Sequence, residues 1–127
     1  MYNILIVDDS STIRKIIIRC IGHTQIAVGK LFEAADGEEA LNVLRENPIH
    51  LVLTDINMPK MSGLELLSRM KSEEQWKNLP VLLITTEGRV DTVLEAANKG
   101  AAGYVKKPFT AVDIQAKIEP LLAAMPS

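Results

Sequence analysis

The sequence has little of what would commit a chain to the cell exterior or to a membrane. It contains one cysteine, Cys20, so no disulfide can form within the chain, which favours a reducing compartment. Its first residues lack the basic start and long apolar stretch of a signal peptide, and no apolar run approaches the roughly 18 residues that span a bilayer. We therefore expect a cytoplasmic protein that does not insert into a membrane.

Neither sign of charge dominates the chain. Its 14 Lys and Arg residues and 16 Asp and Glu residues give a formal net charge of -2. This balance provides no general attraction to nucleic acid, so we expect no nucleic-acid partner. The hydrophobic fraction of 47% over 127 residues is enough for one ordinary core. We expect a single domain over residues 1–127 with no output domain, because no linker or second apolar unit follows residue 123.

Four short apolar runs each end at residues suited to phosphate or metal chemistry. The runs and the polar residues that follow them are 3–7 with Asp8 and Asp9, 50–54 with Asp55, 81–84 with Thr85, and 103–105 with Lys106 and Lys107. Strands that are almost entirely apolar are typical of a parallel sheet covered by helices on both faces. Sites in such sheets form at the carboxyl ends of the strands. We therefore expect carboxylates, a hydroxyl and an ammonium group to meet in one crevice.

Between these runs, apolar residues recur with helical spacing. The segments with this period are 13–21, 40–44, 64–70, 90–97 and 114–122. Ser10, Asp36 and Thr110 stand where helix N-caps are expected. A further strand around 30–34 has the weakest pattern. The order is then strand and helix in alternation, five times, which predicts an α/β doubly wound parallel sheet with right-handed crossovers.

The three acidic residues at strand ends indicate a cation site. Carboxylates packed together repel one another unless a cation lies among them, and oxygen ligands suit Mg2+. Asp8 and Asp9 alone could simply begin a helix, where carboxylates are favoured. With Asp55 and Lys107 at matching strand ends, a shared site is the better interpretation. A carboxylate can itself attack phosphorus, so we predict phosphoryl transfer to Asp55, with charge neutralised by Lys107 and a hydroxyl donated by Thr85.

These residues occur within longer motifs. The motifs are Asp8-Asp9, Asp55-Ile56-Asn57-Met58-Pro59 with Gly63 following, Ile84-Thr85, and Gly103-Tyr104-Val105-Lys106-Lys107-Pro108-Phe109. Together and in this order they resemble the receiver domain of two-component response regulators, and among these the stand-alone chemotaxis regulators. The resemblance covers essentially the whole chain. It implies a flavodoxin-like fold with five parallel strands in the order 2-1-3-4-5.

The resemblance also implies how the site would be used. Asp55 would accept a phosphoryl group from the phosphohistidine of a sensor histidine kinase, and Lys107 would contact that group. Mg2+ would be bound by Asp9, Asp55 and the main-chain carbonyl of Asn57, with Asp8 acting through metal-bound water. The Lys107-Pro108 bond would be cis. On this reading the chain is a phosphoacceptor and not an enzyme acting on another substrate.

The phosphorylated domain would act as a two-state switch. Thr85 would move towards the phosphoryl group and Tyr104 would turn inward, which alters the face made by the fourth helix, fifth strand and fifth helix. A downstream protein, such as a flagellar motor switch component, would bind there. Arg89, Lys99, Lys106 and Lys117 would make this face basic and suited to an acidic partner peptide, unless these charges are only solvated. Lys106 departs from the motor-binding regulators, which commonly have an apolar residue at that place.

Two further polar residues bear on how long the phosphoryl group would last. Asn57 and Glu87 lie two residues beyond Asp55 and Thr85, where they would flank the path of attacking water. We predict fairly fast autodephosphorylation, with a phosphatase as a further expected partner. The alternative is that both are loop residues without a kinetic role.

Three other functions use a similar architecture. A phosphohydrolase with an aspartyl-phosphate intermediate would carry a second carboxylate two residues after its nucleophile, where this chain has Asn57. A flavin-binding domain would not place acidic residues after Val7, because they repel a phosphate that has no metal. A phosphorelay intermediate or a receiver outside motility would have the same site residues, and that alternative stays open.

Overall fold

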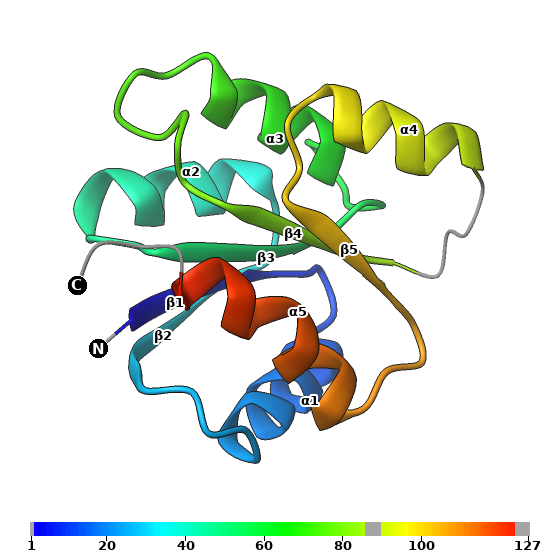
Figure 1. Cartoon of the computed structure of the whole chain (residues 1–127). Helices are drawn as coiled ribbons and strands as arrows, with labels where there is room; N and C mark the ends of the chain where they lie inside the picture. Colours follow the sequence, from blue (N-terminus) through cyan, green and yellow to red (C-terminus); the bar gives the residue numbers. More distant parts are fainter. Residues whose placement is uncertain (1, 86–89, 124–127) are drawn as a thin grey trace.

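The computed structural model of the chain describes residues 2–85 and 90–123, in which strands and helices alternate (Figure 1). The strands are β1 (Tyr2–Val7), β2 (Val28–Ala34), β3 (Leu51–Asp55), β4 (Val81–Thr85) and β5 (Gly103–Lys106). The helices are α1 (Ser11–Gly22), α2 (Gly37–Glu46), α3 (Gly63–Lys71), α4 (Val90–Asn98) and α5 (Ala111–Ala123). Among the described residues, no helix is both long enough and apolar enough to cross a bilayer.

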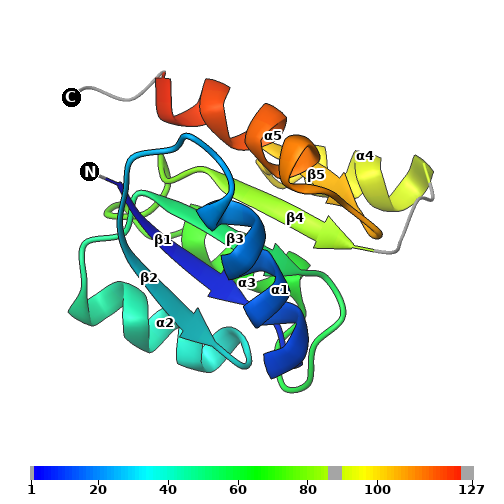
Figure 2. The same ribbon diagram turned by 90° about the horizontal axis from the view of Figure 1, so that it is seen from below.

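The strands form one parallel sheet in the order β2-β1-β3-β4-β5, which confirms the predicted fold. Helices α1 and α5 cover one face, and α2, α3 and α4 cover the other (Figures 1 and 2). The pairing register aligns Val7 with Thr54, and Thr85 with Lys106. The carboxyl ends of β1, β3, β4 and β5 therefore lie at the same edge of the sheet.

The predicted helix starts are confirmed by their capping contacts. The Ser10 hydroxyl accepts a hydrogen bond from the amide of Ile13 at 3.3 Å, and Asp36 accepts one from the amide of Glu39 at 2.9 Å. Thr110 and Asp113 cap α5 reciprocally, each side chain accepting from the other's amide. These contacts satisfy amides that have no partner in the first turn of a helix.

Alternate residues of the strands supply two separate hydrophobic clusters. In β1, Leu5 and Val7 pack under α2 and α3, whereas Ile4 and Ile6 pack under α1 and α5. The period of two along a strand sends neighbouring side chains to opposite faces. Four of the strands extend past the predicted apolar runs by one residue, at Tyr2, Asp55, Thr85 and Lys106. The apolar pattern missed these ends because strand pairing depends on the main chain and tolerates a polar side chain at a strand end.

Candidate functional site

Three acidic side chains meet at the carboxyl edge of the sheet. Asp8 and Asp9 follow β1, and Asp55 ends β3, the strand beside it. One carboxylate oxygen from each of the three lies within 4.8 Å of the others. Asp8 is buried, Asp55 is partly buried and Asp9 is exposed, so the cluster opens to solvent on one side. A group of three carboxylate oxygens at this spacing could hold a divalent cation such as Mg2+, which prefers oxygen ligands and retains several waters.

The ammonium group of Lys107 lies against this cluster. Its Nζ is 3.4 Å from Oδ2 of Asp8 and 3.6 Å from Oδ2 of Asp55. The amide of Lys107 donates a hydrogen bond to the carbonyl of Thr85 at 2.8 Å, which continues the pairing of β5 with β4 just beyond the strand end. The Lys107-Pro108 bond is cis, as the sequence analysis predicted. The sheet therefore fixes the main chain from which Lys107 reaches both carboxylates.

The carboxyl group of Asp55 has an unusual electrostatic environment. Burial raises its pKa above the ordinary value of 3.8, and the Asp8 and Asp9 carboxylates raise it further. The Lys107 ammonium and the amide of Ile56, which donates to Oδ1 at 2.8 Å, act in the opposite direction. Oδ1 is thus held by the main chain, while Oδ2 faces Lys107. The two oxygens of this carboxyl group therefore have different surroundings.

The loop from β3 to α3 passes very close to Asp55. The amide of Gly63 donates to the carbonyl of Ile56 at 2.7 Å, and a Cβ added at Gly63 would lie only 2.1 Å from the carbonyl oxygen of Asp55. Only glycine fits this approach of two main-chain segments. Asn57 lies in this loop with its side chain exposed. The sequence analysis placed Gly63 in the family motif without a reason for it, and the close approach supplies one.

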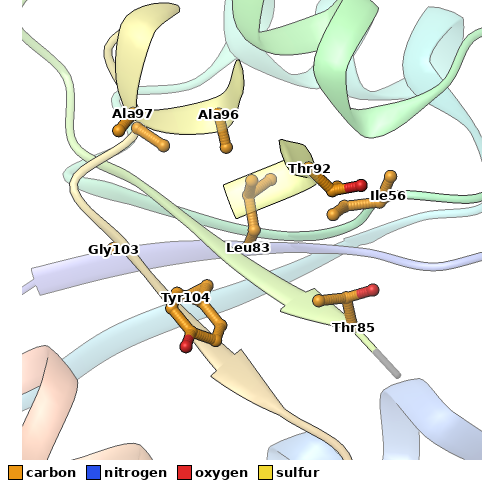
Figure 3. Close-up of a pocket in the computed structure, with 9 residues that line it drawn as sticks. Ile56, Leu83, Thr85, Thr92, Ala96, Ala97, Gly103 and Tyr104 are labelled. Atoms are coloured by element: carbon orange, nitrogen blue, oxygen red, sulfur yellow. The ribbon is translucent and has the colours of Figure 1, made fainter. Parts of the chain in front are cut away.

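A small apolar pocket lies between α4 and the last two strands, beside Thr85 (Figure 3). Its volume is about 70 Å³, and its lining includes Leu83, Thr85, Ala96, Ala97 and Tyr104. Thr85 is buried, whereas Tyr104 is 39% exposed. Figure 3 shows the Tyr104 hydroxyl turned away from the alanine side chains of α4. The tyrosine is therefore in an outward position, with open space between it and α4.

The structure separates the basic residues that were predicted to share one face. Lys106 and Lys117 line a groove with Tyr104 between β5 and α5. Lys99 lies apart from this groove, with its Nζ 3.1 Å from the Ser68 hydroxyl in the groove between α3 and α4, and its role in the output face stays a prediction. Lys99 directly follows α4, and its side chain turns towards α3, a direction that helical spacing alone did not indicate. Glu87 and Arg89, the other residues predicted in this region, lie outside the described residues.

Sequence reasoning missed one side chain next to the acidic cluster. The guanidinium of Arg14, on α1, contacts both the main-chain carbonyl of Asp8 and the carboxylate of Glu33 on β2. The available signal was the position of this arginine, one turn into the helix that begins after two acidic residues. Cys20 packs at the margin of the α1–α5 cluster, and burial raises the pKa of its thiol, in agreement with the interpretation of this cysteine as a core residue.

Comparison with known proteins identifies the family to which this site belongs. Residues 4–119 match the response regulator receiver domain. The chain is 46% identical over 119 residues to chemotaxis protein CheY of Pseudomonas aeruginosa, covering 91% of this chain and 92% of that protein. It is 41% identical over 116 residues to chemotaxis protein CheY-3 of Vibrio cholerae, covering 91% of this chain and 88% of that protein.

Solved structures lead to the same conclusion. The structure of the chemotaxis response regulator CheY4 of Vibrio cholerae superposes with a TM-score of 0.85 at 30% identity, over 95% of this chain and 98% of that one. A response regulator from Chloroflexus aurantiacus superposes with a TM-score of 0.88 at 27% identity, over 96% of this chain and 98% of that one. With its acidic cluster and lysine at the carboxyl edge of a 2-1-3-4-5 sheet, this chain belongs to the response regulator receiver domain family.

Proposed function

We propose that the chain is a phosphoacceptor switch of a two-component system, in which Asp55 receives a phosphoryl group from the phosphohistidine of a sensor histidine kinase. The observation that carries this proposal is the placement of the Lys107 ammonium 3.6 Å from the Asp55 carboxylate, inside a cluster that could hold a cation. Phosphoryl transfer depends mainly on positioning and neutralisation of charge, and both are provided here by residues from three strand ends.

In the transfer step, the Oδ2 atom of Asp55 attacks phosphorus and forms a P–O bond while the P–N bond of the phosphohistidine breaks. The electron pair of the broken bond leaves with the imidazole nitrogen, which takes up a proton from solvent. Oδ2 is the reacting oxygen because Oδ1 is held by the amide of Ile56. Lys107 is placed to neutralise a phosphoryl oxygen while the carboxylate acts as nucleophile.

The residues present fit a hard divalent cation. Asp9 and Asp55 would bind Mg2+ directly together with the main-chain carbonyl of Asn57, and Asp8 would act through a water molecule on the ion. Bound Mg2+ would neutralise charge on the phosphoryl oxygens and on the carboxylates. Without a cation, the positive charge next to this cluster is the Lys107 ammonium, which pairs with Asp8 and Asp55 among the described residues.

The pocket beside Thr85 supports a switch of the kind expected from the family. The Thr85 hydroxyl would bond to the phosphoryl group, and the ring of Tyr104 would move from its exposed position into the pocket next to Ala96 and Ala97. In the sheet, Tyr104 pairs with Leu83, and both residues point to the α4 face, so the ring needs no change of strand register to enter. The surface made by β5 and α5 around Lys106 and Lys117 would change with it.

Intact-protein mass after incubation with acetyl phosphate tests the proposed chemistry. Wild type should gain one phosphoryl group in Mg2+ and none after chelation. Asp55→Asn should gain none under either condition, whereas the control Asp113→Asn, which alters an exposed carboxylate on α5, should behave as wild type. If wild type gains no mass, binding of beryllofluoride distinguishes a short phosphoryl lifetime from a site that does not accept phosphate, and the latter result refutes the proposal.

Within the two-component class, control of chemotaxis is the proposed pathway, since two relatives that match 91% of this chain are named chemotaxis proteins. A peptide from a flagellar motor switch component should bind the beryllofluoride-treated protein more tightly than the untreated protein. Equal binding to both forms, together with onward transfer from Asp55 to a histidine phosphotransfer protein, would instead indicate a phosphorelay intermediate.

Asn57 and Glu87 are proposed to set the phosphoryl lifetime. Asn57 is exposed in the loop after Asp55, where its amide can orient a water molecule. Loss of the phosphoryl group from phosphorylated Asn57→Leu and Glu87→Leu, followed by mass in the absence of donor, should be slower than from wild type. Unchanged rates would show that neither side chain orients the attacking water.

A further inference from the structure

Arg14 makes two hydrogen bonds that join the loop of the acidic cluster to the edge of the sheet. The residue lies on α1, and its amide donates to the carbonyl of Ser10 at 3.1 Å. From there the guanidinium Nη1 donates to the main-chain carbonyl of Asp8 at 2.5 Å, and Nε donates to Oε1 of Glu33 on β2 at 2.9 Å. The Arg14 side chain is only 15% exposed, so the guanidinium lies over the loop rather than in open solvent.

The contact completes a set of restraints on Asp8. Its amide donates to the carbonyl of Ala34 on β2 at 3.1 Å, and its Oδ1 accepts from the amide of Ser10 at 2.9 Å. Its Oδ2 faces Lys107 at 3.4 Å. The bond from Arg14 therefore engages the remaining polar atom of Asp8, its carbonyl oxygen, at the peptide group that leads directly to Asp9.

The charge of Arg14 cannot be the reason for its position. A guanidinium that contacts the main chain of Asp8 would repel a cation arriving at the acidic cluster, and the ion pair with Glu33 offsets that charge. Glu33 itself is 43% exposed, and ion pairs that are open to solvent on one side contribute little to folding stability, roughly 0–1 kcal/mol. What the guanidinium provides is geometry, because its planar fork can donate in two directions at once and a lysine ammonium on a flexible stem cannot reproduce this arrangement.

We propose that Arg14 is a positioning residue for the divalent cation. By holding the carbonyl of Asp8, it fixes the peptide group between Asp8 and Asp9 and so presets both carboxylates, while Glu33 orients the guanidinium. Groups that orient metal ligands without touching the metal typically change metal affinity by about 10–100-fold when they are removed. The inference rests on the proposed function only in taking Mg2+ as the ion that the cluster binds.

Calorimetric titration with Mg2+ of Arg14→Gln and Arg14→Lys tests this role through the sign of the change. If Arg14 acted through charge alone, Arg14→Gln would remove a repulsion and tighten Mg2+ binding. Positioning predicts the opposite, a dissociation constant about 10-fold higher in Arg14→Gln and in Arg14→Lys, with a smaller rise in Glu33→Gln. Arg45→Lys is the matched control, since Arg45 lies on α2, on the opposite face of the sheet from α1, and its Nη1 donates to Oδ1 of Asn42.

Titrations are run at a temperature at which circular dichroism shows every variant folded without Mg2+. A weaker affinity then cannot result from unfolding of the variant. Binding in Arg14→Gln that is tighter than or equal to wild type overturns the proposal. An equal loss of Mg2+ affinity in Arg45→Lys also overturns it, as does a wild type that does not bind Mg2+. If wild type binds Mg2+ but Asp55 is not phosphorylated, the proposed function fails and the role of Arg14 is still decided by the titration.

Discussion

Helices α4 and α5 pack on opposite faces of the same region of the sheet, beside β4 and β5, and they do so with very different side chains. The α5 helix contributes Ile114, Ile118 and Leu122, which are at most 5% exposed, to the cluster that it shares with α1. Of the described side chains of α4, Ala96 is the one that is buried, while Leu94 is 57% exposed. The pocket of about 70 Å³ lies under this helix.

The difference indicates where the domain can change shape at low cost. Moving α5 would expose three large aliphatic side chains, each of which stabilises the fold by about 1.5–3 kcal/mol when buried. Among the α4 side chains that the structure describes, a movement of this helix disturbs mainly the contacts of Ala96, and the open space beside Thr85 and Tyr104 is already present. We therefore infer that α5 is the fixed side of the output surface and α4 the adjustable side.

The largest expected effect comes from weakening the fixed side. Ile118→Ala removes a fully buried side chain from α5 and should lower the free energy of unfolding by about 2–5 kcal/mol. Urea denaturation followed by circular dichroism measures this. Val112→Ala, at a position 75% exposed on the same helix, is the control and should change it little. A loss below about 1 kcal/mol in Ile118→Ala would mean that α5 is no better anchored than α4.

A second substitution tests whether weak packing is confined to α4 or extends to α3 on the same face of the sheet. Gly63→Ala forces a Cβ against the carbonyl of Asp55, so it should lower the free energy of unfolding by about 1–3 kcal/mol and weaken Mg2+ binding. Gly22→Ala is the matched control, because a Cβ added at Gly22 meets no atom within 4 Å. If the two variants have the same free energy of unfolding and the same Mg2+ affinity, the main chain around α3 also adjusts at low cost.

A smaller effect, of opposite sign, is expected at the site itself. The folded state raises the pKa of Asp55 above 3.8, so it binds the proton more tightly than the unfolded chain does, and stability falls as pH rises through this window. Asp55→Asn lacks this loss and should be more stable than wild type at pH 7 without Mg2+, with the gain vanishing below the ordinary carboxyl pKa. Thermal unfolding at several pH values measures the difference. A wild type that is the more stable protein at pH 7 would contradict this.

The smallest change in stability is expected on the adjustable side. Ala97→Leu places a larger side chain towards existing space, so the free energy of unfolding should stay within about 1 kcal/mol of wild type. The same substitution should block the inward movement of Tyr104. With fluorotyrosine incorporated, the 19F signal of Tyr104 should shift on beryllofluoride binding in wild type but not in Ala97→Leu, and Tyr2 serves as the internal reference. A full shift in Ala97→Leu would exclude this pocket as the destination of the ring.

Residues whose positions depend on their own strand were predictable from the sequence. Asp8, Asp55 and Lys107 each follow or end an apolar run, and a parallel sheet brings such ends together whatever the details of packing. The direction of Lys99 was not predictable in this way, because its partner Ser68 lies 31 residues away, on α3. The contact of Arg14 with Glu33 likewise depends on how α1 lies against the edge strand β2.

The sequence by itself determined the alternation of strands and helices, the sheet that results, and the edge at which the acidic and basic site residues gather, since each follows from local hydrophobic period and chain order. Only the tertiary structure decided the need for glycine at position 63, the outward position of Tyr104, the pocket beneath α4 and the restraint of Asp8 by Arg14. These depend on distances between segments far apart in the chain, which packing of the two hydrophobic clusters sets and no local pattern encodes.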